Sequence, residues 1–339
     1  PIIGIPEYKE AVTKAVFLDE VPQDLFIETC YAPGGTGALR NAISCYSSPG
    51  DKILTADWHW APYNVIAAEL GREVKTYTLF DEDYHFNDAS FRKSLSDILA
   101  AQDQAVVIIN TPAHNPTGYT FTLEDWDKVI DIFKSFPHKN IICVVDIAYL
   151  DFAGEAYEYR AFLKKLTGLP HHILPLIAFS ASKGFTMYGM RCGALLCMAP
   201  TAELAKEFRD AASVASRASW SNGNHSAMAV ISKIFADDAL LAKVTDERNH
   251  YMQILQERGR AFMEEANKIG LKCCPYDSGF FITVPCENAE EVGKALQALN
   301  VFAIPLGPGI RVSVASNTVE ECRAIPGRLQ QAIESVNGK

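Results

Sequence analysis

Four short runs of apolar residues, many of them β-branched, place the tightest constraint on how this chain can fold. Each has the length of a strand and carries almost no charge, which is typical of strands buried on both faces of a sheet. Amphipathic helical stretches separate some of them, notably Leu123–Phe136, where Thr122 and Asp125 predict a capping box. Strands that alternate with helices predict an α/β fold with a largely parallel sheet. The four runs are Ala105–Thr111, Ile141–Asp146, Leu176–Phe179 and Cys192–Met198.

The sequence pattern changes after about residue 237. The stretch Asp237–Gly270 is charged, free of proline and as long as a helix that bridges two domains. We therefore expect a large domain over residues 1–240 and a smaller α+β domain over residues 241–339. In the smaller domain the expected elements are strands at Gly279–Val284 and Ile310–Ala315 and a helix at Ala289–Leu299.

Composition argues against several classes of partner. The 339 residues include 41 acidic and 31 basic side chains, a formal charge of -10, whereas a nucleic-acid binder needs a basic surface. No apolar run has the length of a membrane-spanning helix, so we expect no membrane partner. The nine cysteines show no spacing typical of a metal site or a disulfide framework. This favours a protein without a metal in the reducing cytoplasm.

Polar residues follow the predicted strands at their carboxyl ends, which is where open α/β sheets bind ligands. Ser180, Ser182 and Lys183 come directly after Leu176–Phe179, and Arg191 follows eight residues after the lysine. A lysine can form a Schiff base with a carbonyl cofactor, and two cations beside two hydroxyls make a phosphate pocket. A lone lysine is more often a solvated surface residue, so this motif alone supports either interpretation.

Two further strand ends carry candidate site residues. Asp146 closes its strand and Tyr149 follows it; a buried carboxylate is costly unless a cation or hydrogen bonds satisfy it. A protonated pyridine nitrogen would be a suitable partner, and a capping turn is the alternative. Asn115 lies in a loop held rigid by two prolines and a glycine, which a tight structural turn would also explain. We expect the neighbouring His114 to be structural.

A glycine-rich segment and an arginine indicate two anion sites. The segment Gly34–Ala38 leads into a helical stretch at Leu39–Cys45, and its small residues let backbone N–H groups approach a phosphate. Arg311 is flanked by apolar strand residues, so we expect it to be buried unless its strand lies at a sheet edge. A buried arginine needs an anion, either a substrate carboxylate or a structural ion pair.

In chain order these motifs resemble those of one family. The set GGTGA, HNPTG, D-x-A-Y, S-x-S-K-x7-R and R-x-S-V is similar to the fold-type I, class I aminotransferases, closest to the aspartate and aromatic amino acid branch. The likeness runs from the segment Pro1–Ile5 to the strand of Arg311. It implies a mostly parallel mixed sheet sandwiched by helices, a pyridoxal 5'-phosphate cofactor and a homodimer with shared active sites.

The resemblance implies a role for each motif. Lys183 would hold the cofactor as a Schiff base and shuttle a proton, and Asp146 would pair with the pyridinium nitrogen. Asn115 and Tyr149 would hydrogen-bond the phenolic oxygen, and Trp60 would stack on the ring, although a core tryptophan is the alternative. The phosphate contacts would come from Gly35, Thr36, Ser180, Ser182 and Arg191.

Substrate contacts also follow from the resemblance. Arg311 would bind the α-carboxylate, Arg217 would reach a distal carboxylate across the dimer, and Asn115 and Trp60 would lie beside the substrate. The amino group would pass by a ping-pong mechanism to a 2-oxo acid such as 2-oxoglutarate. Aromatic members can keep the distal arginine, so aspartate and aromatic donors both stay open. A C–S β-lyase and a non-catalytic regulator that binds the same cofactor are the alternatives.

The chain departs from the family in three places. Relatives often have serine where Gly34 stands and proline where Gly223 stands, so we expect one phosphate contact to be absent and one loop to differ. In the family an N-terminal arm precedes the segment Pro1–Ile5 and carries a tyrosine that contacts the neighbouring subunit's cofactor. We expect this chain to lack that arm.

Overall fold

The computed structural model describes residues 1–338 and divides into two compact units. Unit 1 contains residues Pro1–Thr111, Phe121–Asp151 and Glu155–Asp246. Unit 2 begins at Glu247 and also includes Pro112–Thr120 and Phe152–Gly154 from earlier in the chain. The expected division after residue 240 stays a prediction.

Unit 1 is built on a seven-stranded sheet with the strand order β1-β7-β6-β5-β4-β2-β3. Strands β2 to β6 are parallel to their neighbours within this group, whereas β7 is antiparallel to both β6 and β1. The expected mostly parallel mixed sheet is therefore confirmed. The strands are β1 (Phe26–Ala32), β2 (Lys52–Ala56), β3 (Glu73–Tyr77), β4 (Gln104–Asn110), β5 (Asn140–Asp146), β6 (Ile173–Ser180) and β7 (Gly193–Ala199).

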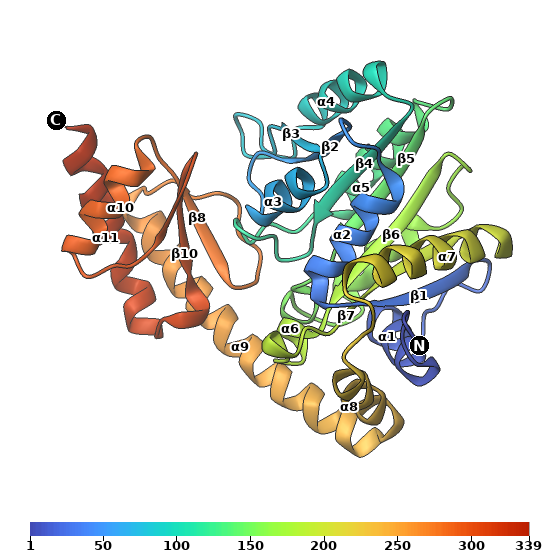
Figure 1. Ribbon diagram of the computed structural model, residues 1–339. Coiled ribbons are helices and arrows are strands. Elements are labelled where there is room, and N and C mark those ends of the chain that lie inside the picture. The colour runs from blue at the N-terminus through green and yellow to red at the C-terminus, as the bar shows by residue number, and fades with distance from the viewer. Residues whose placement is uncertain (339) are drawn as a thin grey trace. The chain divides into compact units, whose positions relative to one another are not determined.

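Helices cover both faces of this sheet. Ile53, Val106 and Leu176 share an apolar cluster with helices α2, α3 and α7, and Figure 1 shows α2 lying along the sheet. Val107, which points to the opposite face, is also buried, and α4 contacts β2, β3 and β4. The helices are α1 (Pro6–Phe17), α2 (Gly34–Tyr46), α3 (Pro62–Glu69), α4 (Asp88–Ala101), α5 (Leu123–Lys134), α6 (Ala181–Gly184), α7 (Ala202–Ser219) and α8 (His225–Ala236), with 3-10 turns η1 (Leu150–Phe152), η2 (Glu158–Leu166) and η3 (Tyr188–Met190).

The starts of two helices follow from their local sequence. Helix α5 begins with the predicted capping box, in which Thr122 Oγ1 accepts from the Asp125 N–H at 3.1 Å and Asp125 Oδ2 accepts from the Thr122 N–H at 2.9 Å. Helix α2 begins at Gly34, so the expectation that the glycine-rich segment only leads into a helix at Leu39 was wrong. The segment is itself the first turn, and a Cβ atom at Gly37 would lie 2.4 Å from Pro33 Cδ.

Unit 2 contains a three-stranded antiparallel sheet of order β8-β10-β9. One face of this sheet packs against helices through a cluster that includes Phe262, Ile282, Val292, Ile310 and Leu329 (Figure 1). This is the smaller α+β arrangement that was expected near the C-terminus. Its elements are α9 (Asp238–Ile269), which starts in unit 1, β8 (Phe281–Pro285), α10 (Ala289–Ala298), β9 (Ile304–Leu306), β10 (Gly309–Ser313), η4 (Val314–Ser316) and α11 (Val319–Asn337).

Two strand boundaries in unit 2 differ from the prediction. Strand β8 begins at Phe281 rather than Gly279, because Gly279 has a φ of 94° and a Cβ atom there would lie 2.7 Å from Ala113 Cβ. Strand β10 ends at Ser313, where the chain turns into η4. Within residues 1–338, no helix has both the length and the apolar character that a bilayer crossing requires.

Candidate active site

Asp146 lies at the carboxyl edge of the unit 1 sheet, in register with Asn110 of β4 and Ala178 of β6. It is 5% exposed; its Oδ2 accepts from the Tyr63 hydroxyl at 2.7 Å and its Oδ1 accepts from the Ala148 N–H at 3.2 Å. Burial raises the pKa of Asp146 to about 6, and the hydrogen bond from Tyr63 opposes this rise. No lysine, arginine or histidine among residues 1–338 forms an ion pair with it.

Tyr63 is a site residue that the sequence analysis missed. It lies in the first turn of α3, is 1% exposed, and burial raises its pKa well above the usual value. Its ring stacks on His59 with centroids 6.2 Å apart and meets the edge of Trp60 at 5.6 Å. The run Trp58-His59-Trp60 before Pro62 could have pointed to Tyr63, because it places several aromatic rings next to the start of a helix.

Lys183 follows β6 in the short helix α6 and is half-buried. Its Nζ lies 5.9 Å from the ring centroid of Tyr149 and 4.6 Å from that of Tyr188, a residue not singled out from the sequence. The Ser180 Oγ accepts from the Ser182 N–H at 3.3 Å and caps α6. Asp146 is the last residue of β5 and Lys183 comes three residues after the end of β6, so both lie at the carboxyl ends of neighbouring parallel strands.

Arg191 is held against the first turn of α2. Its Nη2 donates to the Pro33 carbonyl at 3.1 Å, and its Nη1 donates to the Tyr188 carbonyl at 3.0 Å and to Ser182 Oγ at 3.4 Å. A Cβ atom at Gly34 would lie 2.4 Å from Arg191 Nη2, so the guanidinium occupies the space of a side chain at this position. The φ of 75° at Gly34 favours glycine for a second reason.

These groups offer hydrogen-bond donors and a positive charge that suit an anion. The N-terminus of α2, a 13-residue helix, presents backbone N–H groups and the positive end of the helix dipole. Gly35 and Thr36 belong to this first turn, and a Cβ atom at Gly35 would lie 3.3 Å from Ser180 Cβ. Arg191 adds a fixed cation, which suits a phosphate.

Unit 2 presents a second cation, Arg311. It lies in β10, the central strand, yet it is half-buried rather than buried, because Ile310 and Val312 face the helices and Arg311 points to the other face. Its Nη1 donates to Asn115 Oδ1 at 2.9 Å, and its Cζ lies 4.4 Å from the Phe281 ring centroid. Asn115 is 5% exposed, so the arginine is oriented by a buried amide and an aromatic face.

The remaining predicted residues lie in unit 1. Trp60 is half-buried and packs on the unit 1 core, which supports the core alternative for part of its surface. Arg217 is exposed in the last turn of α7, where its Nη1 donates to Ser221 Oγ at 2.9 Å. At Gly223 a Cβ atom would lie 2.6 Å from the Tyr31 ring, so this loop excludes a larger side chain.

Known proteins similar to this chain are aminotransferases. The family model "Aminotransferase class I and II" matches residues 1–329. The chain belongs to this family. The Escherichia coli (strain K12) aromatic-amino-acid aminotransferase is 29% identical over 319 residues, which are 91% of this chain and 77% of that protein. The Salmonella typhi aspartate aminotransferase is 27% identical over 337 residues, 96% and 82% of the two chains.

The fold is likewise that of an aminotransferase. The crystal structure of an aminotransferase from Anaerococcus prevotii matches with a TM-score of 0.95 and 33% identity, covering 98% of this chain and 82% of that chain. The fold-type I assignment is thereby confirmed. The chain is a pyridoxal-phosphate-dependent aminotransferase, because class I and II aminotransferases use this cofactor.

The residues present in unit 1 fit pyridoxal phosphate. Asp146 is a buried carboxylate with two neutral donors and no cation partner among residues 1–338, which suits a protonated ring nitrogen. Lys183 supplies the primary amine that a Schiff base requires. The first turn of α2 with Arg191 suits the phosphate group.

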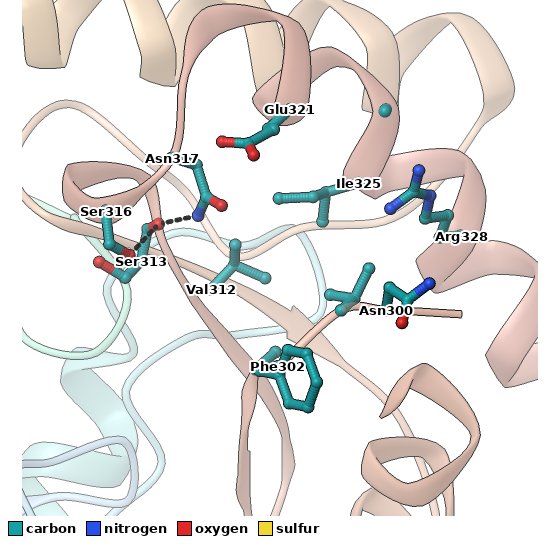
Figure 2. Close-up of a pocket in the computed structure, with 12 residues that line it drawn as sticks. Asn300, Phe302, Val312, Ser313, Ser316, Asn317, Glu321, Ile325 and Arg328 are labelled. Atoms are coloured by element: carbon teal, nitrogen blue, oxygen red, sulfur yellow. Dashed lines mark hydrogen bonds between the residues drawn. The ribbon is translucent and has the colours of Figure 1, made fainter. Parts of the chain in front are cut away.

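A pocket of about 350 Å³ in unit 2 has a different lining (Figure 2). Its polar residues include Glu321, which accepts from the Thr318 N–H at 2.7 Å, and Asn317, which donates to the Ser313 carbonyl at 2.6 Å. The first contact caps the start of α11, and the second spans the turn η4. None of the predicted site residues lines this pocket, and we assign it no role in the reaction.

Proposed function

We propose that this aminotransferase moves the amino group of aspartate or an aromatic amino acid to a 2-oxo acid such as 2-oxoglutarate in a ping-pong cycle. The names of the two curated relatives support both donor classes. The observation that carries the proposal is Arg311, whose half-buried guanidinium is oriented by Asn115 and Phe281. An oriented guanidinium can bind a carboxylate through two hydrogen bonds, and every amino acid donor has an α-carboxylate.

Each candidate residue has a separate role at the cofactor. Pyridoxal phosphate supplies an electron sink for the carbanion at the substrate Cα. We assign Lys183 to covalent attachment of the cofactor and to moving the proton between the substrate Cα and the cofactor C4′. Asp146 keeps the ring nitrogen protonated, and Tyr149 donates to the phenolic oxygen. We assign Asn115 a hydrogen bond to the same phenolic oxygen and a position beside the substrate.

Binding of the phosphate and ring falls to a separate group of residues. The backbone N–H groups of the first turn of α2 and the hydroxyls after β6 offer donors, and Arg191 offers a fixed charge. Trp60 stacks on the ring and borders the substrate. The phosphate ligands in this proposal are Gly35, Thr36, Ser180, Ser182 and Arg191.

We assign Arg217 to the recognition of dicarboxylic substrates. Its side chain is exposed and contacts Ser221, so it is available to a second subunit. In a homodimer with shared active sites, Arg217 of one subunit binds the distal carboxylate of a dicarboxylic substrate held by the other. Exposed apolar residues on unit 1, such as Val65 and Val214 at 68% and 72% exposure, are consistent with a subunit contact.

A chemical trap tests the attachment site and the donor. Borohydride reduction should fix the cofactor to Lys183, which peptide mass spectrometry locates, and Lys183→Ala should carry none. Mixing the loaded enzyme with each amino acid in turn should bleach the cofactor absorbance only for true donors. A label on another lysine, or no response to aspartate or any aromatic amino acid, would refute the assignment.

Subunit complementation tests the shared site. Lys183→Ala and Arg217→Ala are each expected to transaminate aspartate poorly, the second by about 100-fold, whereas Arg217→Ala should keep most activity on phenylalanine. After subunit exchange, one site in each mixed dimer has both residues, so aspartate activity should recover to about a quarter of wild type. No recovery would place Arg217 and Lys183 of the same subunit together, or Arg217 outside the site.

The proposed location is the cytoplasm, without a nucleic-acid or membrane partner. None of the nine cysteines, all within residues 1–338, forms a disulfide, which suits a reducing compartment. Cell fractionation with an antibody to the chain tests this part of the proposal.

A further inference from the structure

We propose that Tyr63 is a positioning residue that keeps the Asp146 carboxylate ionised, and thereby holds the proton on the ring nitrogen of the bound cofactor. The inference rests on the proposed role of Asp146. Tyr63 itself touches neither substrate nor cofactor in this proposal, and it acts only through the aspartate.

The geometry leaves the Tyr63 hydroxyl little freedom. Its ring is stacked on His59 at an interplanar angle of 7° and meets Trp60 at 86°. His59 is itself fixed, with Nδ1 2.8 Å from the Ala56 carbonyl and Nε2 2.8 Å from Asn64 Nδ2. The hydroxyl therefore stays aimed at Asp146 Oδ2, 2.7 Å away.

The surroundings of Asp146 make its ionisation depend on this hydrogen bond. Burial raises the pKa of Asp146, and the two groups that oppose the rise are the Tyr63 hydroxyl and the Ala148 N–H. The titratable group that contacts Asp146 is Tyr63 from α3, and Tyr63 in turn interacts electrostatically with Tyr149 from the turn after β5. Because the pKa of Tyr63 is itself raised well above its usual value, Tyr63 remains a neutral donor at any physiological pH.

A neutral donor has a consequence that a cationic partner would not have. A lysine or arginine here would stabilise the carboxylate but would also cancel its charge, leaving little to attract a pyridinium ion. A phenol stabilises the ionised form and leaves the negative charge uncompensated. The site therefore keeps both the charge and the affinity for a protonated ring nitrogen.

Tyr63→Phe removes the hydroxyl and keeps the ring. This takes away a hydrogen bond that stabilises the ionised carboxylate, so the pKa of Asp146 should rise by about one pH unit or more. Since that pKa is about 6 in the wild type, a much larger fraction of Asp146 would be protonated at neutral pH. The ring nitrogen should then lose its proton at a lower pH.

Carboxyl NMR of the full-length protein labelled with ¹³C at aspartate tests this directly. Asp146→Asn identifies the Asp146 resonance by its loss, and Tyr77→Phe is the matched control, a buried tyrosine of the same unit that forms no bond to Asp146. We expect the measured pKa of Asp146 to be higher in Tyr63→Phe and unchanged in Tyr77→Phe. Placing 3-fluorotyrosine at position 63 strengthens the donor and should move it downward. An unchanged titration in both position-63 variants overturns the inference.

The loaded enzyme supplies the second readout. With ¹⁵N-labelled pyridoxal phosphate, the ring nitrogen of Tyr63→Phe should deprotonate at lower pH than that of the wild type, and equal titrations would also overturn the inference. The two proposals fail separately. If Asp146→Ala keeps full turnover, the role of Asp146 is wrong, whereas if Asp146 matters but Tyr63→Phe titrates normally, only the inference about Tyr63 is wrong.

Discussion

Unit 1 buries two charged side chains to the same extent but surrounds them very differently. Arg160 and Asp146 are each 5% exposed. Asp146 has two neutral donors, the Tyr63 hydroxyl and the Ala148 N–H, and no ion pair among residues 1–338. Arg160 has a carboxylate and three backbone oxygens within 3.1 Å. Those partners are Asp151, Ala15, Val16 and Ala156.

In our proposal, the difference separates a structural charge, that of Arg160, from a functional one, that of Asp146. The guanidinium of Arg160 is compensated by Asp151 at 2.6 Å, and it satisfies carbonyls in the last turn of α1, where the helix dipole favours a cation. These partners offset part of the cost of removing the charge from water. The charge of Asp146 is stabilised but not compensated within the protein, which is costly for folding and useful for binding a cationic ring.

The largest effect is expected when the Asp146 carboxylate is removed. Asp146→Ala should retain some cofactor but lower turnover by about 10³-fold or more, equivalent to about 4 kcal/mol for a buried charge pair. Near pH 7 the apo-protein should unfold at or above the wild-type temperature, because no protein cation loses its partner and a buried, uncompensated charge is removed. Steady-state kinetics and calorimetry measure the two effects. Full turnover would contradict the contrast drawn above.

Removing the structural charge should act mainly on stability. Arg160→Met removes the cation that pairs with Asp151 at 2.6 Å, so the free energy of unfolding should fall by about 3–5 kcal/mol in urea titrations. The double variant Arg160→Met, Asp151→Asn should recover part of this loss. A loss below about 1 kcal/mol would mean that the pair does not stabilise the fold.

The pH dependence of stability sharpens the comparison. The folded-state pKa of Asp146 lies above its ordinary value of 3.8, at about 6, so the folded apo-protein binds this proton more tightly than the unfolded chain does. Asp146 therefore lowers stability as pH rises from about 4 to 6, by up to about 3 kcal/mol. Asp146→Asn should remove this component, which urea titrations at several pH values detect as the difference from wild type. Parallel curves for the two proteins would show that Asp146 ionises normally.

The smallest effect comes from a neutral contact far from either charge. Thr122→Ala removes the capping box of α5 and should lower stability by about 1 kcal/mol without changing cofactor binding. Thermal unfolding and cofactor titration check both parts. A change in cofactor binding would show that stability and site geometry are coupled, and the contrast between the two buried charges would then need a wider explanation.

Much of the site was predictable because it depends on local sequence. The strand before Lys183 and the strand that ends at Asp146 were both predicted within a few residues, and their parallel pairing places their ends side by side. The capping box of α5 and the helix α9 also follow from short-range patterns. Chain order of these motifs was enough to suggest the family, which the family match then confirmed.

Other features depend on partners that are distant in the sequence. Tyr63 is 83 residues from Asp146, and Arg160 is 144 residues from Val16, so no local pattern joins them. The half-exposure of Arg311 was also mispredicted, because a central strand can leave one face uncovered by helices. Gly34 was predicted to precede the helix, and the need for glycine there depends on Arg191, which is far away in the sequence.

The sequence alone determined which elements form and which chemical groups stand at their ends, since hydrophobic periodicity and capping act over a few residues. Tertiary structure decided how each charge is partnered, because the strength of a buried charge depends on every atom that surrounds it. For Asp146 the side-chain partner is the hydroxyl of Tyr63, which comes from helix α3 between β2 and β3. This hydrogen bond stabilises the ionised carboxylate without compensating its charge.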